Sequence, residues 1–219
     1  MKEYWSIPGP RNALSKHEGQ ECIGFYKHDG SNLRFEYSRK QGWYKSGTRN
    51  RLFDETDNEY GRAIEIFNNT HAEGLEKVFR DKYPKFDRAI VYCEFFGPNS
   101  FAGWHCWTDQ FELKLFDVDI HKRGFVLPRE FVENFGHLNT PEVLYEGPFN
   151  QELVDNVKEN YLGEEIVLEE GIVIKGGATQ HKFWMAKIKT KWWLNELKKK
   201  AEKIDSLKSV LLENEREQS

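Results

Sequence analysis

Short stretches of alternating hydrophobic and polar residues fill the first part of the chain, as expected for β-strands with one buried face. Residues 21–26 and 33–38 follow this pattern, and the residues between them at 29–32 are four turn formers. The pattern predicts a hairpin of two strands, with Lys27 at its mouth.

A longer period runs from residue 57 to residue 80, where apolar side chains recur at helical spacing and a proline lies beyond the end. This segment predicts a structural helix. Two strands are predicted after it, at residues 88–96 and 111–118, and both carry acidic residues among β-forming ones. Carboxylates in such strands either face water or have a function.

The second half of the chain also alternates between helical and strand patterns. A helix is predicted at residues 149–162, followed by strands at residues 166–168, 171–175 and about 183–191. Together these elements predict an α+β fold, in which antiparallel β-sheets are flanked by helices.

From Trp192 onwards the pattern is that of one helix with a partly apolar stripe. The stripe consists of Leu197, Ala201, Ile204, Leu207 and Leu211. We therefore expect a domain over residues 1–191 and a helical tail over residues 192–219. The stripe fits either packing of the tail on its own domain or a contact with a protein partner, such as a coiled coil.

The composition is ordinary for a globular protein, with 38% hydrophobic, 15% aromatic and 31% charged residues in a chain of 219. The sequence has no run of about eighteen apolar residues and no secretory signal, so we expect no membrane span and a cytoplasmic location. The net charge of −4 is not typical of nucleic-acid-binding proteins. Any contact with a nucleic acid would therefore need local positive charge.

The cysteines Cys22, Cys93 and Cys106 are odd in number and lack the Cys-x-x-Cys spacing. This pattern argues against a disulfide framework and against a structural zinc site. We expect reduced thiols.

Lys27 is a candidate for covalent chemistry, although the segment Lys27-x-Asp29-Gly30 taken alone fits a surface turn better. A free lysine has a pKa of about 10.4 and attacks only when a desolvated pocket or neighbouring cations lower that pKa. Lys187 and Lys189 are candidates for those cations. Residues two apart in a strand share a face, so both ammonium groups would lie on the same side of the strand. Lys191 falls on the same face, so a register two residues later stays open.

Five short motifs place Lys27 in a wider pattern that covers most of the chain. They are Lys27-His28-Asp29-Gly30, Cys93-Glu94-Phe95-Phe96-Gly97, Leu115-Phe116-Asp117-Val118, Glu170-Gly171-Ile172-Val173-Ile174-Lys175 and Lys187-Ile188-Lys189. In this order they resemble the motifs of the covalent nucleotidyltransferases, the superfamily of ATP-dependent ligases and mRNA capping enzymes. The resemblance implies that Lys27 attacks the α-phosphate of ATP and releases pyrophosphate, with Mg²⁺ or Mn²⁺ as the metal cofactor.

The resemblance also gives roles to the other motif residues. Lys187 and Lys189 are implied as catalytic residues that bind the α-phosphate and the leaving pyrophosphate. The implied cofactor-binding set is Asp29, Gly30, Asn32, Arg49, Glu94, Phe96, Glu170 and Lys175. Within it, a strand carboxylate at position 94 would accept the ribose hydroxyls, and an arginine at position 49 would bind phosphate.

Glu170 is the implied metal ligand, and its motif contains a conflict. Glu170 and Lys175 are an odd number of residues apart, so a regular strand would direct them to opposite faces. Either the strand is irregular close to Gly171 or Gly176, or only Glu170 faces the nucleotide.

The aromatic residue expected to stack on the adenine, three residues before Phe116, is replaced by Leu113. Phe96 and Phe111 are the alternatives for that contact. The base contact therefore departs from the pattern of the family.

Asn32 separates the possible kinds of nucleotidyltransferase. DNA ligases and capping enzymes carry arginine five residues after the nucleophile, whereas Asn32 resembles the nick-sealing phage RNA ligases. The 28 residues after Lys191 are also fewer than the roughly hundred that an oligonucleotide-binding barrel needs. We therefore expect an ATP-dependent RNA ligase that passes AMP to an RNA 5′-phosphate and seals that end to a 3′-hydroxyl.

Two alternatives stay open. The chain could be a capping-type or other end-modifying enzyme with GTP in place of ATP. It could also be a nucleotide-binding or RNA-binding module that has kept the fold and lost turnover.

Overall fold

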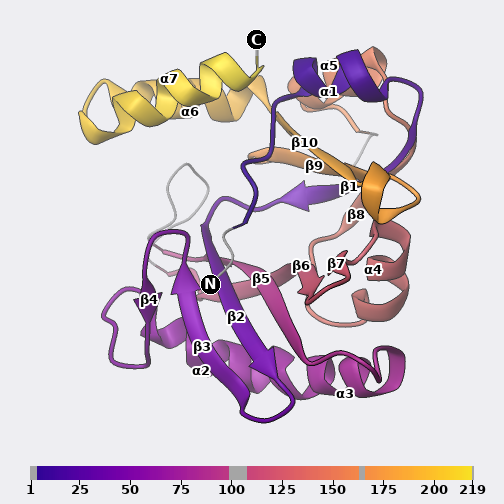
Figure 1. Ribbon diagram of the computed structural model, residues 1–219. Helices are drawn as coiled ribbons and strands as arrows, with labels where there is room; N and C mark the ends of the chain where they lie inside the picture. Colours follow the sequence, from indigo (N-terminus) through magenta and orange to yellow (C-terminus); the bar gives the residue numbers. More distant parts are fainter. Residues whose placement is uncertain (1–3, 99–107, 163–165, 219) are drawn as a thin grey trace. The chain divides into compact units, whose positions relative to one another are not determined.

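The computed structural model describes residues 4–98, 108–162 and 166–218, and it divides them into two compact units (Figure 1). The first unit comprises Tyr4 and residues 30–98 and 108–141; the second comprises residues 5–29, 142–162 and 166–218. Each unit has an antiparallel sheet and its own helices, which confirms the α+β class.

The first unit contains a six-stranded sheet with the strand order β4-β3-β2-β5-β6-β7. Its strands are β2 (Ser31–Ser38), β3 (Gly42–Thr48), β4 (Leu52–Phe53), β5 (Arg88–Phe96), β6 (Glu112–Ile120) and β7 (Gly124–Phe125). The strands predicted from the β2, β5 and β6 segments are thus confirmed in place.

The helices of the first unit are α2 (Gly61–Phe67), the π-helical turn η1 (Asn68–Ala72), α3 (Glu73–Lys82) and α4 (Pro128–Phe135). One face of the sheet packs against them: Phe35 on β2 stacks on Phe67 of α2 with ring centroids 3.9 Å apart. Leu33 and Val91 on the same face are fully buried. The helix predicted over residues 57–80 is therefore present, although a π-helical turn interrupts it.

The second unit contains a four-stranded sheet with the order β10-β9-β1-β8. Its strands are β1 (Glu21–Lys27), β8 (Val143–Pro148), β9 (Gly171–Gly176) and β10 (Trp184–Lys189). Its helices are α1 (Pro10–His17), α5 (Gln151–Lys158), the short 3₁₀ turn η2 (Gln180–Lys182), α6 (Lys191–Ala201) and α7 (Ser206–Gln218).

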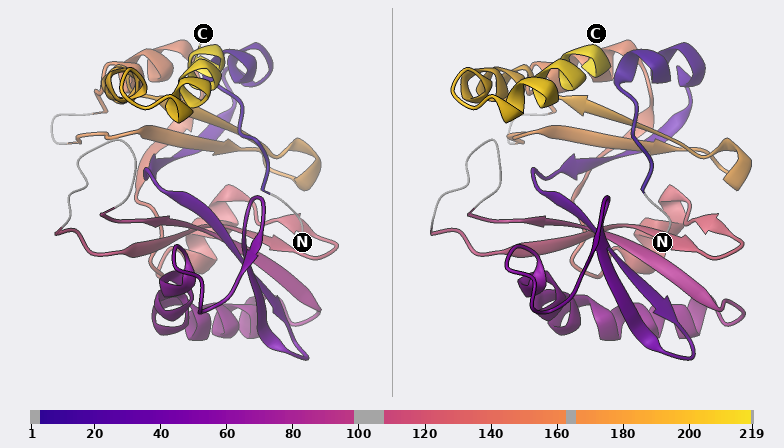
Figure 2. Two further views of the ribbon diagram at one scale, coloured as in Figure 1. Left: turned by 90° about the vertical axis from the view of Figure 1, so that its left-hand side faces the viewer. Right: turned by 60° about the vertical axis from the view of Figure 1, so that its left-hand side comes forward.

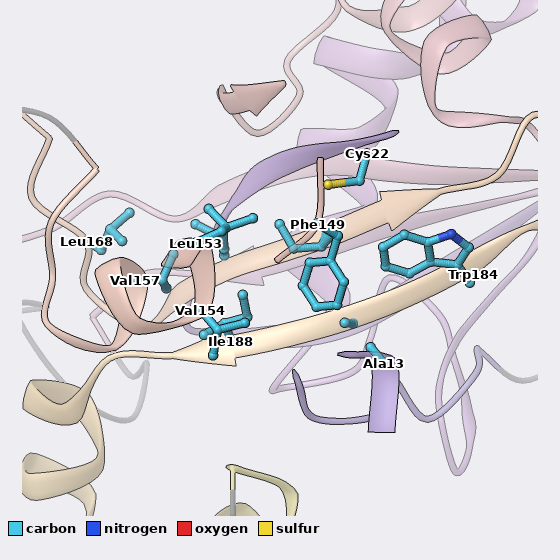
Figure 3. Close-up of a cluster of buried hydrophobic side chains, with 12 residues drawn as sticks. Ala13, Cys22, Phe149, Leu153, Val154, Val157, Leu168, Trp184 and Ile188 are labelled. Atoms are coloured by element: carbon cyan, nitrogen blue, oxygen red, sulfur yellow. The ribbon is translucent and has the colours of Figure 1, made fainter. Parts of the chain in front are cut away.

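Helices α1 and α5 cover the same face of the four-stranded sheet (Figure 2). Leu153 and Val154 of α5 and Ala13 of α1 pack there against isoleucines of β9 and β10 (Figure 3). These side chains are almost completely buried, so that this face forms the core of the unit. The opposite face of the sheet carries Lys27, Lys175, Lys187 and Lys189.

The predicted hairpin around Lys27 is wrong. Strand β1 pairs with β8 and β9, and β2 pairs with β3 and β5, so the two strands belong to different sheets. The turn formers at residues 29–32 carry the chain from the second unit to the first. Each strand thereby gains partners distant in sequence, which local turn chemistry cannot reveal.

Three further predictions needed correction. Residues 166–168 lie outside any strand, and β10 ends at Lys189 because the next residue caps α6. The C-terminal segment forms two helices instead of one, since Leu211 of α7 folds back on Trp193 and Leu197 of α6. Part of the apolar stripe is thereby buried within the segment itself.

The elements α1, α4, β7 and β8 were not predicted. Both of these helices begin with a proline at the first helical turn, a start signal that the sequence did contain. None of the helices in the described part of the chain is long and apolar enough to span a bilayer.

Candidate active site

The ends of three strands lie side by side in the sheet of the second unit. Lys27 at the end of β1 is opposite Gly171 at the start of β9, and Gly171 is opposite Lys189 at the end of β10. Because Gly171 has no side chain, the two lysines flank bare backbone. The residue immediately before that glycine is Glu170.

The Glu170 carboxylate joins the two lysines. Its Oε2 accepts a hydrogen bond from Lys27 Nζ at 2.7 Å, and its Oε1 lies 2.6 Å from Lys189 Nζ. The side chains of Glu170 and Lys189 are 4% and 7% exposed, whereas that of Lys27 is 19% exposed. Lys27 is therefore the member of the trio that solvent and ligands reach most easily.

Burial and neighbouring charge act in opposite directions on this trio. Burial raises the pKa of Glu170, but the Lys189 and Lys27 ammonium groups outweigh it and hold that pKa below the usual value. Burial lowers the pKa of Lys189 despite the opposing effect of Glu170, and the nearby Lys27 and Lys187 cations lower it further. Glu170 is thus ionised at neutral pH.

Gly171 allows this geometry. Its φ of +145° is one that side-chain-bearing residues rarely adopt, and a Cβ there would lie 1.9 Å from the Ile188 carbonyl oxygen. The backbone is therefore irregular at the start of β9, so Glu170 is freed from the alternation of the strand. This resolves the conflict between Glu170 and Lys175 that the sequence left open.

Lys175 lies on the same face of the sheet as Lys27, because the register pairs it with Ile23, four residues before Lys27 in β1. It is 3% exposed, and its Nζ lies 5.0 Å from the centre of the Phe25 ring. The face opposite the hydrophobic core therefore carries four lysines, at positions 27, 175, 187 and 189.

The structure also distinguishes the two possible registers of the C-terminal lysines. Lys187 and Lys189 are both in β10, whereas Lys191 is the first residue of α6 and forms an exposed ion pair with Glu159. Lys187 forms an ion pair with Glu217 of α7 at 2.7 Å. The geometry favours Lys187 and Lys189 as the paired lysines.

Two residues that sequence reasoning missed hold Lys189 in place. Thr190 donates from its hydroxyl to the Glu169 carbonyl at 2.8 Å and from its amide to the Glu170 carbonyl at 2.9 Å. The same hydroxyl caps α6 by accepting the Trp193 amide. The Trp193 ring centre lies 3.7 Å from Lys189 Nζ. A threonine just before a helical pattern is the signal that could have revealed this cap.

The remaining predicted residues belong to the first unit. Asn32 on β2 lies directly opposite Glu94 on β5, on the sheet face that does not pack against the helices. Phe96 shares the Glu94 face by strand alternation and is buried. Gly30 is required by close packing, since a Cβ there would lie 2.5 Å from the Phe95 carbonyl oxygen. Asn32 and Glu94 are thus neighbours.

Asp29 and Arg49 have contrasting environments. Asp29 is 8% exposed and follows β1 as the last residue of the second unit before the chain enters the first. Arg49 lies on the exposed turn after β3. An exposed guanidinium can reach an anionic ligand without losing a structural contact in the core.

The departure at Leu113 has a structural cause. Leu113 is fully buried in the core of the first unit, on the face away from Glu94. Phe111 stacks on Phe95 with ring centroids 5.3 Å apart, and the Arg62 guanidinium covers it at 5.2 Å. Of the two alternatives for the base contact, only Phe96 shares the Glu94 face.

A divalent metal fits this site only as a partner of bound phosphates. Among the residues that the structure describes, no group of three or more histidine, cysteine or acidic side chains converges. Mg²⁺ commonly uses one or two carboxylates together with substrate phosphates and water, and Glu170 would provide one such carboxylate. The donor set is therefore compatible with a metal that arrives with a nucleotide.

One family profile matches most of the chain. The sequence profile described as RNA ligase matches residues 20–193. A search of curated protein sequences gave no significant match.

Several solved structures of the RNA ligase of Naegleria gruberi have the same fold, with a TM-score of 0.64. A mutant with ATP and Mn shares 13% identity and aligns with 89% of this chain and 58% of its own. A structure with PPi shares 14% identity over 91% and 58%, and a mutant with AMP and Mn shares 14% over 89% and 57%. This chain thus spans less than two thirds of these neighbours. With the family profile covering most of its length, the chain belongs to the RNA ligase family, a family of enzymes.

Proposed function

We propose that this chain is an ATP-dependent RNA ligase that works through a covalent lysyl-adenylate on Lys27. The observation that carries the proposal is the trio in which one buried carboxylate, Glu170, holds Lys27 and Lys189 at 2.7 and 2.6 Å. These are the lysines that the resemblance makes nucleophile and phosphate ligand. A partly exposed lysine beside a second ammonium group suits attack on an anionic phosphorus centre.

In the first step, Lys27 Nζ attacks the α-phosphorus of ATP. The new bond is phosphorus to nitrogen, and the bond to the bridging oxygen breaks, so pyrophosphate leaves with that electron pair. Lys27 Nζ must lose its protons on the way; Glu170 Oε2 lies 2.7 Å from it, but the lowered pKa makes this carboxylate a weak base, so the protons pass on to solvent. Lys187 and Lys189 provide positive charge for the α-phosphate and the leaving group.

The nucleoside contacts rest on residues of the first unit. Glu94 would accept the ribose hydroxyls and Phe96 would cover the base, as the resemblance implies for that motif. Arg49 and Lys175 would bind phosphate. The metal, Mg²⁺ or Mn²⁺, would offset negative charge on the triphosphate and have Glu170 as its protein ligand.

In the second step, the RNA 5′-phosphate attacks the phosphorus of the lysyl-adenylate and takes the AMP, which frees Lys27. In the third step, a 3′-hydroxyl attacks the activated 5′-phosphate and releases AMP. Asn32 supports a preference for nicked duplexes, since it resembles the residue of nick-sealing phage RNA ligases. Its place opposite Glu94 is compatible with a role at the activated end.

The proposal is tested with 5′-phosphorylated RNA strands, single-stranded and as a nicked duplex, incubated with enzyme, ATP and Mg²⁺. We expect joined product that disappears with Lys27→Ala and persists with the control Lys16→Ala, because Lys16 is exposed on α1. A nicked duplex should be joined faster than single strands. An enzyme that acquires no nucleotide from ATP would contradict the proposal.

The capping-type alternative predicts a different nucleotide. Competition between labelled ATP and unlabelled GTP distinguishes the two functions. A ligase should still become labelled from ATP, whereas a capping-type enzyme should take its nucleotide from GTP and stay unlabelled. A chain that binds nucleotide and RNA without any covalent intermediate would instead be a binding module.

A further inference from the structure

Lys187 has a carboxylate partner from the last turn of the C-terminal helix. The Oε2 atom of Glu217 on α7 lies 2.7 Å from Lys187 Nζ, and the two side chains are 18% and 17% exposed. Both groups are partly screened from solvent, so their interaction is stronger than that of a fully exposed ion pair. An element outside the five motifs thus reaches a predicted phosphate ligand.

The backbone that carries Glu217 is held against the N-terminal segment. A Cβ on Gly9 would lie 1.4 Å from the Glu217 carbonyl oxygen, so the two backbones touch directly. The neighbouring Pro8 carbonyl accepts a hydrogen bond from the Lys187 amide at 3.0 Å. The same segment therefore contacts both members of the ion pair through their backbones.

The packing of α7 on α6 adds to this placement. Leu211 of α7 lies against Trp193 and Leu197 of α6, and Asn214 is 6% exposed with its amide donating to the Val210 carbonyl. The helix can stay docked while the Glu217 side chain changes rotamer, because its backbone and apolar contacts do not depend on the carboxylate.

We propose that the Glu217 carboxylate occupies the place of a phosphate group beside Lys187 Nζ. A polyphosphate must displace this carboxylate in order to bind Lys187. The inference rests on the proposed function, in which Lys187 binds the phosphates of ATP. A carboxylate and a phosphate oxygen use the same ammonium donors, and a carboxylate beside a bound pyrophosphate adds like-charge repulsion. Glu217 therefore weakens the binding of pyrophosphate and of ATP.

The two carboxylates of this face differ in role. Glu170 pairs with two lysines from within the strand motifs, whereas Glu217 pairs with Lys187 from the C-terminal helix α7. If Glu217 instead served to orient Lys187 for catalysis, its removal would weaken phosphate binding. The two roles thus predict opposite changes in the affinity for phosphates when Glu217 is replaced.

The test is isothermal titration of the full chain with inorganic pyrophosphate. Glu217→Gln keeps the size of the side chain and removes its charge, so we expect pyrophosphate to bind about three- to tenfold more tightly. Glu213→Gln makes the same charge change at an exposed position of α7 and should leave the affinity unchanged. In a Lys187→Met background, Glu217→Gln should give no gain.

A second readout is the rate of lysyl-adenylate formation. Glu217→Gln should raise this rate at subsaturating ATP and leave it unchanged at saturating ATP, because only binding is altered. Thermal unfolding of each variant checks that the fold is kept.

Unchanged or weaker pyrophosphate binding by a folded Glu217→Gln variant would overturn the inference while leaving the ligase proposal intact, provided that the wild type forms the lysyl-adenylate. A wild type that forms no lysyl-adenylate and binds no pyrophosphate would overturn both.

Discussion

At the scale of single residues, the candidate site depends on how charge is distributed around Glu170. One buried carboxylate faces two ammonium groups, so both of its oxygens are engaged in this structure. Removing one partner of a buried pair leaves the other charge uncompensated, which costs more than the pair itself contributes. The trio is therefore sensitive to any change at Glu170.

Glu170→Gln should lower the free energy of unfolding by about 3 kcal/mol at neutral pH, because Lys189 would then be buried without its anion. The folded-state pKa of Glu170 lies below the value of 4.5 expected when unfolded. The stability that it contributes is thus present above that value and is lost as the pH falls through the folded-state pKa. Urea unfolding at neutral and acidic pH should show that the difference in the free energy of unfolding between wild type and variant becomes smaller towards low pH.

The control for that experiment is Glu213→Gln, which removes an exposed carboxylate of α7. It should change the free energy of unfolding by less than about 0.5 kcal/mol. A gap between Glu170→Gln and wild type that stayed constant or widened in acid would contradict the assigned charge state.

Gly171→Ala should cost about 3 kcal/mol or more, because the new Cβ meets the Ile188 carbonyl oxygen and φ is unfavourable for alanine. Gly19→Ala is the matched control: its φ of +78° is also unfavourable, but a Cβ there meets no atom within 4 Å. That control should cost only about 1 kcal/mol. Equal losses in urea unfolding would show that the close approach at Gly171 is not what requires the glycine.

At the scale of elements, the site forms where β1 and β10 end beside the start of β9 and where α6 begins. Thr190 joins these elements, since it bonds to the backbone before β9 and caps the helix that follows β10. The start of α6 also brings the Trp193 ring against Lys189. The position of Lys189 therefore depends on a helix cap.

Thr190→Val keeps the shape of the side chain and removes its hydroxyl, so it should lower the free energy of unfolding by about 1 to 2 kcal/mol. It should also slow lysyl-adenylate formation through Lys189. Thr190→Ser keeps the hydroxyl and should restore both properties to near the wild-type level. A valine variant as stable and active as the serine variant would refute the role of the cap.

Periodicity located many of these elements but not their partners. The β5, β6, β9 and β10 segments were predictable because their apolar and β-branched residues alternate clearly. The pairing of β1 was not, because the turn formers at residues 29–32 look the same whether the chain turns back or crosses to another unit. Short elements such as β8, with its half-exposed side chains, carry little signal.

The site itself was predictable as far as motif order defines it. The structure brings together Lys27, Glu170 and Lys189, three of the residues to which the resemblance gives a role. Trp193, Thr190 and Glu217 were not foreseen, because their contacts depend on how α6 and α7 pack on the unit. Thr190 left one signal, a threonine just before a helical pattern, whereas Trp193 and Glu217 carry no motif by which a single sequence could reveal them.

At the scale of the whole molecule, the predicted site residues are divided between two units, each with its own sheet. The second unit carries Lys27, proposed as the nucleophile, and Lys187 and Lys189, proposed as the phosphate-binding lysines. The first unit carries Asn32, Glu94 and Phe96. The resemblance implies that these residues contact the nucleoside or the RNA end to be joined. Covalent chemistry at Lys27 is the part of the account on which all other roles depend.

The central claim is tested by peptide mass spectrometry after incubation with ATP and Mg²⁺. We expect a single adenylate on the peptide containing Lys27, removed by added pyrophosphate and absent from Lys27→Ala. Wild-type protein without an adenylate, or an adenylate that persists in Lys27→Ala, would contradict the account.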